Sequence, residues 1–199
     1  MMQPAIVGLA AAAALLAACG QKAAAPAAQA AAPAVPGAWT VDKTASRIEF
    51  SGTQTGKAFT GRFETFDATI VFDPEDLAAA KIEAVIDTGS AKTGDRQRDA
   101  ALPGAEWFSA KTFPQARFVS DSVTAASGGY EARGKLTIRE AEKDLTLPFT
   151  LSIEGGRAVA DGAVTLNRAD FGVGQGEEFL TDKWVGYDVK VTVHIEATR

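Results

Sequence analysis

Residues 130–154 read YEARGKLTIREAEKDLTLPFTLSIE and contain two runs in which apolar and polar side chains alternate strictly. The apolar positions of the first run are 130, 132, 134, 136 and 138, and those of the second are 145, 147, 149, 151 and 153. Because successive side chains of a strand point to opposite faces, each run predicts a strand with one apolar face. The polar segment 139–144 predicts the turn of a hairpin between them.

The same alternation recurs through the rest of the chain after residue 38. It predicts further strands near residues 47–51, 59–72, 82–86, 116–120, 158–166 and 189–195. Only Asp95–Leu102, which Pro103 follows, has the composition and the stop signal of a helix. About eight short amphipathic strands with one short helix predict an all-β fold, an antiparallel eight-stranded barrel, with a sandwich as the alternative. Pro148 lacks a backbone N–H, so we expect an interrupted ladder or a bulge there.

The composition is that of a globular protein, and it excludes several kinds of site. Of 199 residues, 46% are hydrophobic and 23% charged. From residue 42 onward there are 19 basic and 25 acidic side chains, and this excess of negative charge disfavours nucleic acid as a partner. One cysteine permits no intrachain disulfide, and one histidine permits no histidine-rich metal site. We therefore expect no metal.

The N-terminal segment resembles the signal peptide of a bacterial lipoprotein. Residues 4–18 form an alanine-rich apolar run that is short for a transmembrane helix and typical of a signal peptide. The run ends in LAACG at 16–20, which resembles a lipobox and implies cleavage before Cys19 and lipidation of its thiol and amino groups. Since no aspartate follows Cys19 directly, the resemblance implies the periplasmic face of the outer membrane. The alternative is an ordinary secretory signal with an incidental cysteine.

The predicted organisation therefore has three parts. Residues 1–18 are the signal peptide, and residues 19–38 comprise the lipidated cysteine and a tether rich in alanine and proline, which has no residues to build a core. Residues 39–199 are the folded barrel domain.

Five short motifs of this domain follow one another in the order of a known family. They are WTVD at 39–42, FETF at 63–66, the pattern of Arg98-Asp99, Leu102, Trp107-Phe108, Phe113-Pro114 and Phe118, GKLTIREAEKDLTLPF at 134–149 and LNRADFG at 166–172. Together they resemble the YceI-like family of bacterial envelope proteins, from about Trp39 to the C-terminus.

The resemblance implies a lipocalin-like barrel around an apolar tunnel. It further implies a carrier or reservoir for a long-chain amphiphilic lipid, such as a polyprenyl quinone or polyprenyl phosphate, and no catalytic cofactor. The alternative is a structural or interaction protein of the envelope whose barrel is filled by its own side chains and holds no ligand.

Many inward positions of the predicted strands carry small residues, which would leave room in the lumen, whereas a barrel packed by its own side chains needs bulky ones. These small residues are Gly61, Ala68, Ala84, Ala132, Gly134, Ala158, Ala160 and Gly162. The opposing interpretation is that large side chains of facing strands, or Trp107 and Phe108, fill the gaps.

The residues predicted to line the lipid tunnel share the inward face of the strands. They are Ile48, Phe50, Phe63, Ile70, Phe72, Ile86, Phe118, Ala132, Gly134, Leu136, Ile138, Leu147, Phe149, Leu151 and Leu166.

A phosphate or quinone oxygen at a tunnel mouth needs hydrogen-bond donors, and arginine offers a planar fork of them. Arg96, Arg98, Asp99 and Arg168 are the headgroup candidates. The alternative interpretation is that Arg98–Asp99 and Arg168–Asp170 are structural or solvated charges.

Catalysis is not expected. His194, the single histidine, is predicted on the outward face of the last strand, away from any lumen. The carboxylates of residues 177–182 lie in a polar segment that they keep solvated.

Overall fold

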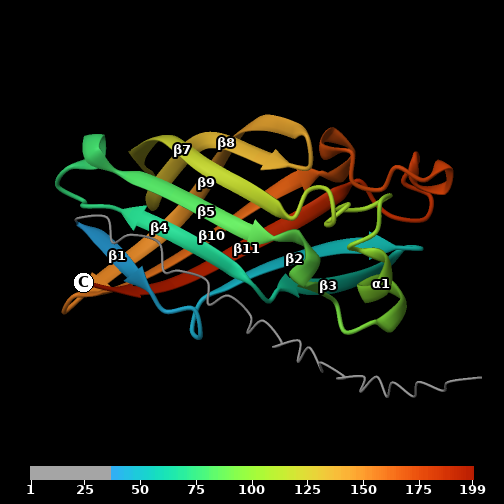
Figure 1. The fold of residues 1–199 in the computed structure, drawn as a ribbon. Helices are drawn as coiled ribbons and strands as arrows, with labels where there is room; N and C mark the ends of the chain where they lie inside the picture. The colour runs from blue at the N-terminus through green and yellow to red at the C-terminus, as the bar shows by residue number, and fades with distance from the viewer. Residues whose placement is uncertain (1–36) are drawn as a thin grey trace, which may run out of the picture. The chain divides into compact units, whose positions relative to one another are not determined.

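The computed structural model describes residues 37–199, which fold into a β-barrel (Figure 1). The predicted signal peptide, Cys19 and the tether up to residue 36 lie outside the described residues. The strands are β1 (Ala38–Val41), β2 (Arg47–Gln54), β3 (Lys57–Phe63), β4 (Phe66–Val71), β5 (Lys81–Asp87), β6 (Ala91–Lys92), β7 (Gln115–Ala126), β8 (Gly129–Ile138), β9 (Ala141–Glu154), β10 (Arg157–Asn167) and β11 (Asp188–Thr198). The helical segments are η1 (Leu77–Ala79), η2 (Thr88–Ser90), α1 (Arg96–Ala101), η3 (Arg168–Phe171) and η4 (Glu177–Phe179). No helix among residues 37–199 is both long and apolar enough to cross a membrane.

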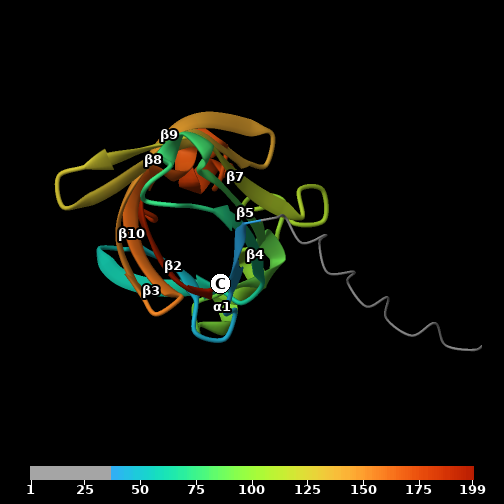
Figure 2. The same cartoon turned by 90° about the vertical axis from the view of Figure 1, so that its left-hand side faces the viewer.

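The strands form one antiparallel sheet that closes on itself. Eight strands follow one another in the order β1-β4-β5-β7-β8-β9-β10-β11, and pairing between β1 and β11 completes the ring (Figure 2). Strands β2, β3 and β6 continue the sheet from β11. Closure of the ring leaves fewer strand edges that could pair with other chains. The predicted all-β fold, an antiparallel eight-stranded barrel with one short helix, is confirmed, and α1 with its cap residues Asp95 and Leu102 has the predicted bounds.

The central hairpin has a tighter turn than the sequence suggested. Ile138 of β8 pairs with Ala141 of β9, so only two residues connect the strands. The prediction of a turn from 139 to 144 was wrong, because residues 142–144 belong to β9 and their polar side chains pair across the hairpin. Lys135, for example, forms an ion pair with Asp144. Arg139, in the turn, has a φ of 55°, in the left-handed region that β-hairpin turns of two residues require.

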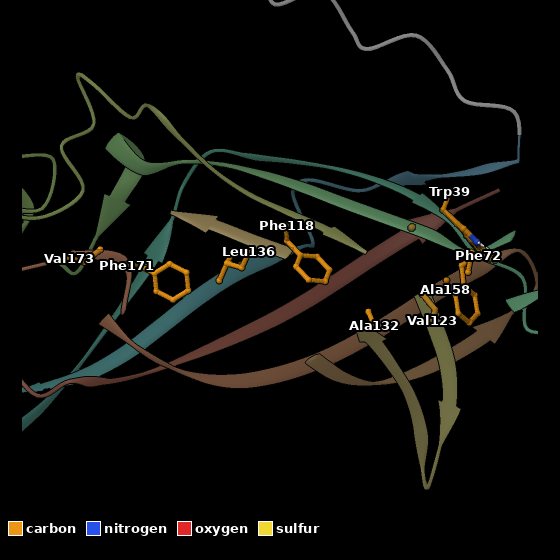
Figure 3. Packing of buried hydrophobic residues seen from close by; sticks show 11 residues of the cluster. Trp39, Phe72, Phe118, Val123, Ala132, Leu136, Ala158, Phe171 and Val173 are labelled. Atoms are coloured by element: carbon orange, nitrogen blue, oxygen red, sulfur yellow. Dashed lines mark hydrogen bonds between the residues drawn. The ribbon is translucent and has the colours of Figure 1, made fainter. Parts of the chain in front are cut away.

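The interior packs into two neighbouring clusters of buried side chains. Figure 3 shows the larger one extending along the barrel, from Val173 and Phe171 at one end to Phe72 and Trp39 at the other. The smaller cluster consists of Ile48, Phe66, Ile86, Ala116 and Ile195. Most members of both clusters come from inward positions of the strands, as the alternation predicted, whereas Phe171 and Val173 of the larger cluster come from η3 and the loop after it.

Two inward glycines have a packing role that differs from the one expected. A Cβ atom on Gly134 would lie 2.0 Å from the carbonyl oxygen of Val119, where β7 carries one extra residue between Ser120 and Ser122. A Cβ atom on Gly61 would lie 2.4 Å from the ring of Phe50. At these positions the small residues permit close contact within the wall, so they do not enlarge the lumen.

The β9–β10 ladder is incomplete. Its first pair is Glu154–Arg157 and its last pair is Phe149–Gly162. The ladder thus ends next to Pro148, where we predicted an interruption because proline has no backbone N–H. Residues 141–148 of β9 and 163–167 of β10 therefore have no ladder between them, although β9 remains paired with β8 and β10 with β11.

Candidate ligand-binding site

The barrel contains two apolar cavities. The first, here the Trp39 cavity, has a volume of about 90 Å³. It is lined by Trp39, Ile70, Phe72, Ile82, Leu147, Phe149, Leu151, Ile153, Ala158, Ala160, Gly162, Val193, Ile195 and Ala197. The second, here the Trp107 cavity, has a volume of about 110 Å³. It is lined by Phe50, Phe59, Phe63, Leu102, Trp107, Phe108, Ile138, Leu166, Arg168, Phe171, Val173, Val185, Val189 and Val191.

Neither cavity alone has the size of a typical ligand pocket, which is roughly 300–1,000 Å³. Packed side chains such as Ile48, Phe66 and Ile86 belong to the lumen without lining either cavity. The interior is therefore partly filled, and what it offers a ligand is two separate apolar spaces.

The residues predicted to line the tunnel all lie on inward positions, but they divide into two groups. Nine line one of the cavities: Phe50, Phe63, Ile70, Phe72, Ile138, Leu147, Phe149, Leu151 and Leu166. The other six belong to the packed wall and core and line neither cavity: Ile48, Ile86, Phe118, Ala132, Gly134 and Leu136. Their contact with a lipid stays a prediction.

The barrel end beside the Trp39 cavity carries a hydrogen-bonded tryptophan. Trp39 is only 5% exposed, and its indole N–H donates to the carbonyl oxygen of Phe72 at 2.9 Å. The Arg199 guanidinium lies over the Trp39 ring at 4.6 Å from its centroid. These contacts fix the position of the ring at this end of the lumen.

At the opposite end, Arg168 holds the segment of residues 173–186. This side chain is buried, and its three nitrogens donate to backbone carbonyls on both sides of the 173–186 segment. The acceptors are the carbonyl oxygens of Val173, Gly174, Phe179, Thr181, Val185 and Gly186. Burial lowers the pKa of the Arg168 guanidinium. Because its N–H groups all donate to backbone carbonyls, Arg168 has none left for a lipid headgroup. This agrees with the alternative interpretation, in which Arg168 is a structural charge.

The other headgroup candidates gather around α1. Arg98 donates to Gln54 at 2.8 Å and to Thr93 at 3.2 Å, and it lies over the Phe59 ring of the Trp107 cavity. Asp99 accepts hydrogen bonds from the backbone N–H and hydroxyl of Thr93. Arg96 is exposed on the same helix. The structure thus brings Arg98 close to a cavity wall, whereas Asp99 serves the loop before the helix.

The role of Asp99 gives a pH-dependent prediction. The two hydrogen bonds from Thr93 lower the pKa of the Asp99 carboxyl, so its ionised form stabilises the fold above the unfolded-state pKa and this contribution is lost as the pH falls below about 4. We expect Asp99→Asn to melt at a lower temperature than the wild type at pH 7, and the gap to narrow at pH 3. Thermal unfolding of both proteins at the two pH values checks this, and an unchanged gap would contradict it.

Arg139, for which the sequence predicts only a place in a turn, also binds at the end of the barrel that Arg168 holds. One of its terminal nitrogens donates to the carbonyl oxygens of Ala105, Trp107 and Gly172, at 3.2, 2.8 and 2.7 Å. The guanidinium thereby joins the hairpin turn to the loop after α1 and to the end of η3. The sequence offered no signal for this role, since an arginine in a polar turn is usually solvated.

The outer face of the barrel carries a groove of about 610 Å³. Its polar wall includes His194, whose Nδ1 lies 2.7 Å from Asp161, and Nε2 of the same ring lies 3.4 Å from Glu196. Hydrogen bonds from Arg157 and His194 lower the pKa of Glu196. Among residues 37–199 no cluster of three or more metal-ligating side chains is present. His194 lies on the outward face, as predicted.

Comparison with known proteins gives a consistent family and fold. A model described as YceI-like domain matches residues 39–197. BcnA from Burkholderia cenocepacia is 34% identical, with a TM-score of 0.76 over 79% of this chain and 99% of BcnA. A polyisoprenoid binding domain from Saccharophagus degradans, implicated in plant cell wall breakdown, shares the fold at 19% identity, with a TM-score of 0.64 over 80% of this chain and 97% of that domain.

Sequence relatives include the UPF0312 protein of Yersinia enterocolitica. It is 34% identical over 125 residues, which are 61% of this chain and 65% of the relative. A UPF0312 protein of Yersinia pestis matches over the same extent. The chain thus spans about 65% of the length of these curated relatives.

Proposed function

The chain belongs to the YceI-like domain family, and from this premise we propose that it binds a long-chain isoprenoid or similar amphiphilic lipid inside its barrel. The ligand class is that of polyprenyl quinones and polyprenyl phosphates, and the role is that of a carrier or reservoir. The resemblance of the fold to a polyisoprenoid binding domain supports this proposal.

The observation that carries the proposal is the composition of the two cavities. The Trp39 cavity is lined by aliphatic and aromatic residues, and the Trp107 cavity adds a single charged residue, Arg168, whose donors are engaged. Such walls offer no partner to a polar solute but suit a branched hydrocarbon chain. An apolar ligand that fills these spaces would stabilise the folded state.

The packed middle of the lumen favours one alternative. Side chains such as Ile48 and Phe66 occupy space in the lumen that a long lipid tail would need. This packing favours a structural or interaction module that holds no ligand. A lipid longer than one cavity must displace side chains between the two.

The proposal includes location and chemistry. The lipobox-like sequence at Cys19 supports a lipoprotein on the periplasmic face of the outer membrane, reached through the tether of residues 19–38. We propose a binding role without catalysis, since the single histidine lies on the outer face, beside Asp161 and away from the apolar cavities.

Extraction of the purified full-length protein tests the ligand. Organic solvent should release a long-chain isoprenoid lipid in a molar ratio near one to the protein, identified by mass spectrometry. Repeated preparations without such a lipid, together with no uptake of ubiquinone-10 from detergent micelles, would support the ligand-free alternative.

A substitution at Ala160 tests the place of binding. This residue lines the Trp39 cavity, so Ala160→Leu adds a bulky side chain where the tail is proposed to lie. We expect uptake of ubiquinone-10 to fall at least tenfold while the melting temperature changes little, because the added side chain can enter a cavity of about 90 Å³. Ser152→Leu on the exposed face of β9 is the matched control and should take up the quinone normally. Equal uptake by both variants would place the ligand elsewhere.

A further inference from the structure

Side chains held by hydrogen bonds lie at both ends of the barrel. At one end, Trp39 is bonded to Phe72 and covered by Arg199. At the other end, Arg168 holds the 173–186 segment and Arg139 ties the loop after α1 to η3. A ligand chain that entered at either end would have to pass these hydrogen-bonded side chains.

The wall has an unbonded stretch between β9 and β10. It is defined by residues 141–148 of β9 and 163–167 of β10 and is called the seam below; no ladder joins its two sides. The last pair before it, Phe149–Gly162, bounds it at one end, and a contact between β9 and η3 bounds it at the other. Parting the strands here breaks no ladder, because β9 keeps its pairs with β8 and β10 keeps its pairs with β11.

The inward side chains along the seam are not fully buried. Lys143 occupies an inward position of β9 and is nevertheless exposed to solvent. Four inward apolar residues that follow the seam are only partly buried: Leu145, Leu147, Val164 and Leu166. Leu147 lines the Trp39 cavity and Leu166 the Trp107 cavity, so the seam has one cavity wall on each side.

At the end of the seam, the outside and the inside of the barrel are close together. The outer groove of about 610 Å³ and the Trp39 cavity share three lining residues, Phe149, Gly162 and Val193. Gly162 has no side chain to thicken the wall, and a Cβ atom there would lie 3.0 Å from the carbonyl oxygen of Pro148. A chain that leaves the outer groove at this point meets the cavity directly behind the last pair of the ladder.

We infer that the lipid chain enters and leaves the barrel sideways, through the seam between β9 and β10, with the outer groove as its approach. This inference rests on the proposed function. It places the moving part of the protein in a stretch without a β9–β10 ladder, where the two strands can separate without breaking ladder hydrogen bonds. Both cavities then become accessible from one opening, although the core between them is packed.

A cross-link across the seam tests the route. If the alignment of the ladder is continued, Thr146 lies opposite Thr165, and both are exposed. In the full chain carrying Cys19→Ser, Thr146→Cys with Thr165→Cys is joined by a short bis-maleimide. The control pair, Ser152→Cys with Val159→Cys, joins the same two strands where they are already paired. Uptake of ubiquinone-10 is followed by quenching of the fluorescence of Trp39 and Trp107, which line the two cavities.

We expect the seam cross-link to slow both uptake and release of the quinone at least tenfold, and the control cross-link to leave both rates unchanged. If the seam-linked protein exchanges quinone as fast as its unlinked form, the route is wrong while lipid binding stands. If the unlinked protein and the control take up no quinone at all, the proposed function fails and the route with it.

Discussion

Replacing Arg168 with methionine is expected to lower the free energy of unfolding by about 3–5 kcal/mol. The side chain is 4% exposed, and methionine can fill much of its volume but donates no hydrogen bond. The six carbonyl oxygens that Arg168 now serves would lose their donor, and those that stay buried would carry the desolvation cost. A loss of this size is a large part of the stability of an ordinary domain. Equilibrium unfolding in guanidinium chloride measures it.

Arg168→Lys serves as the matched control for the charge. Lysine keeps the positive charge, but its compact ammonium cannot reach carbonyls on both sides of the 173–186 segment as the planar fork does. We therefore expect a smaller, intermediate loss. If Arg168→Met loses less than about 1 kcal/mol, the segment is held by other contacts, and the assignment of Arg168 as its anchor is wrong.

Gly134→Ala is expected to destabilise the barrel by about 2–3 kcal/mol, although it adds a single methyl group. That methyl would lie 2.0 Å from the Val119 carbonyl oxygen and 2.7 Å from Cα of Ser120. These atoms belong to the backbone, which cannot rotate away as a side chain can. A shift of β7 would also disturb the hydrogen bond between the N–H of Ile82 and the Ser120 hydroxyl, 2.8 Å long. Thermal and denaturant unfolding report the change.

Gly52→Ala is the control for this substitution. Its added methyl would meet the end of the Phe59 ring at 3.3 Å, and a small rotation of that ring relieves the contact. The expected loss is below about 1 kcal/mol. If both substitutions lower the free energy of unfolding by the same small amount, the backbone of β7 adapts to the added methyl group and the close contact at Gly134 is not required.

The alternation of apolar and polar residues predicted the barrel because its period is local. The face of each side chain in a strand such as β9 follows from its position in the sequence. The alternate residues from Leu145 to Ile153 could therefore be assigned to the inside without knowledge of the neighbouring strands. The short helix was equally readable, since Asp95 caps it and Pro103 follows its end. The turn of the central hairpin could not be predicted correctly. Polar residues such as 142–144 are compatible both with a turn and with a strand that has a neighbour on one side only.

The site depended on contacts between distant residues and could be predicted only in part. Nine of the residues predicted from their inward parity do line a cavity. Parity alone cannot distinguish an inward side chain that faces a cavity from one that is packed against other side chains. Gly134 was predicted to leave room in the lumen, but in the structure it allows the backbone of β8 to lie close to that of β7. Arg168 looked like a headgroup donor, and all its donors serve the backbone of a loop that follows it in sequence.

The sequence by itself determined most of the strands, their inner faces and the helix, because these follow from side-chain period and capping. It left a barrel and a sandwich as alternatives, and the pairing of β1 with β11, which closes the barrel, came from the structure. Only the tertiary structure decided where that barrel is full, where it is hollow and where its wall is unbonded. Those properties depend on interatomic distances of a few ångströms between strands such as β9 and β10, and on a ladder that stops at Pro148. No local pattern encodes such distances, since they result from the packing of the whole interior.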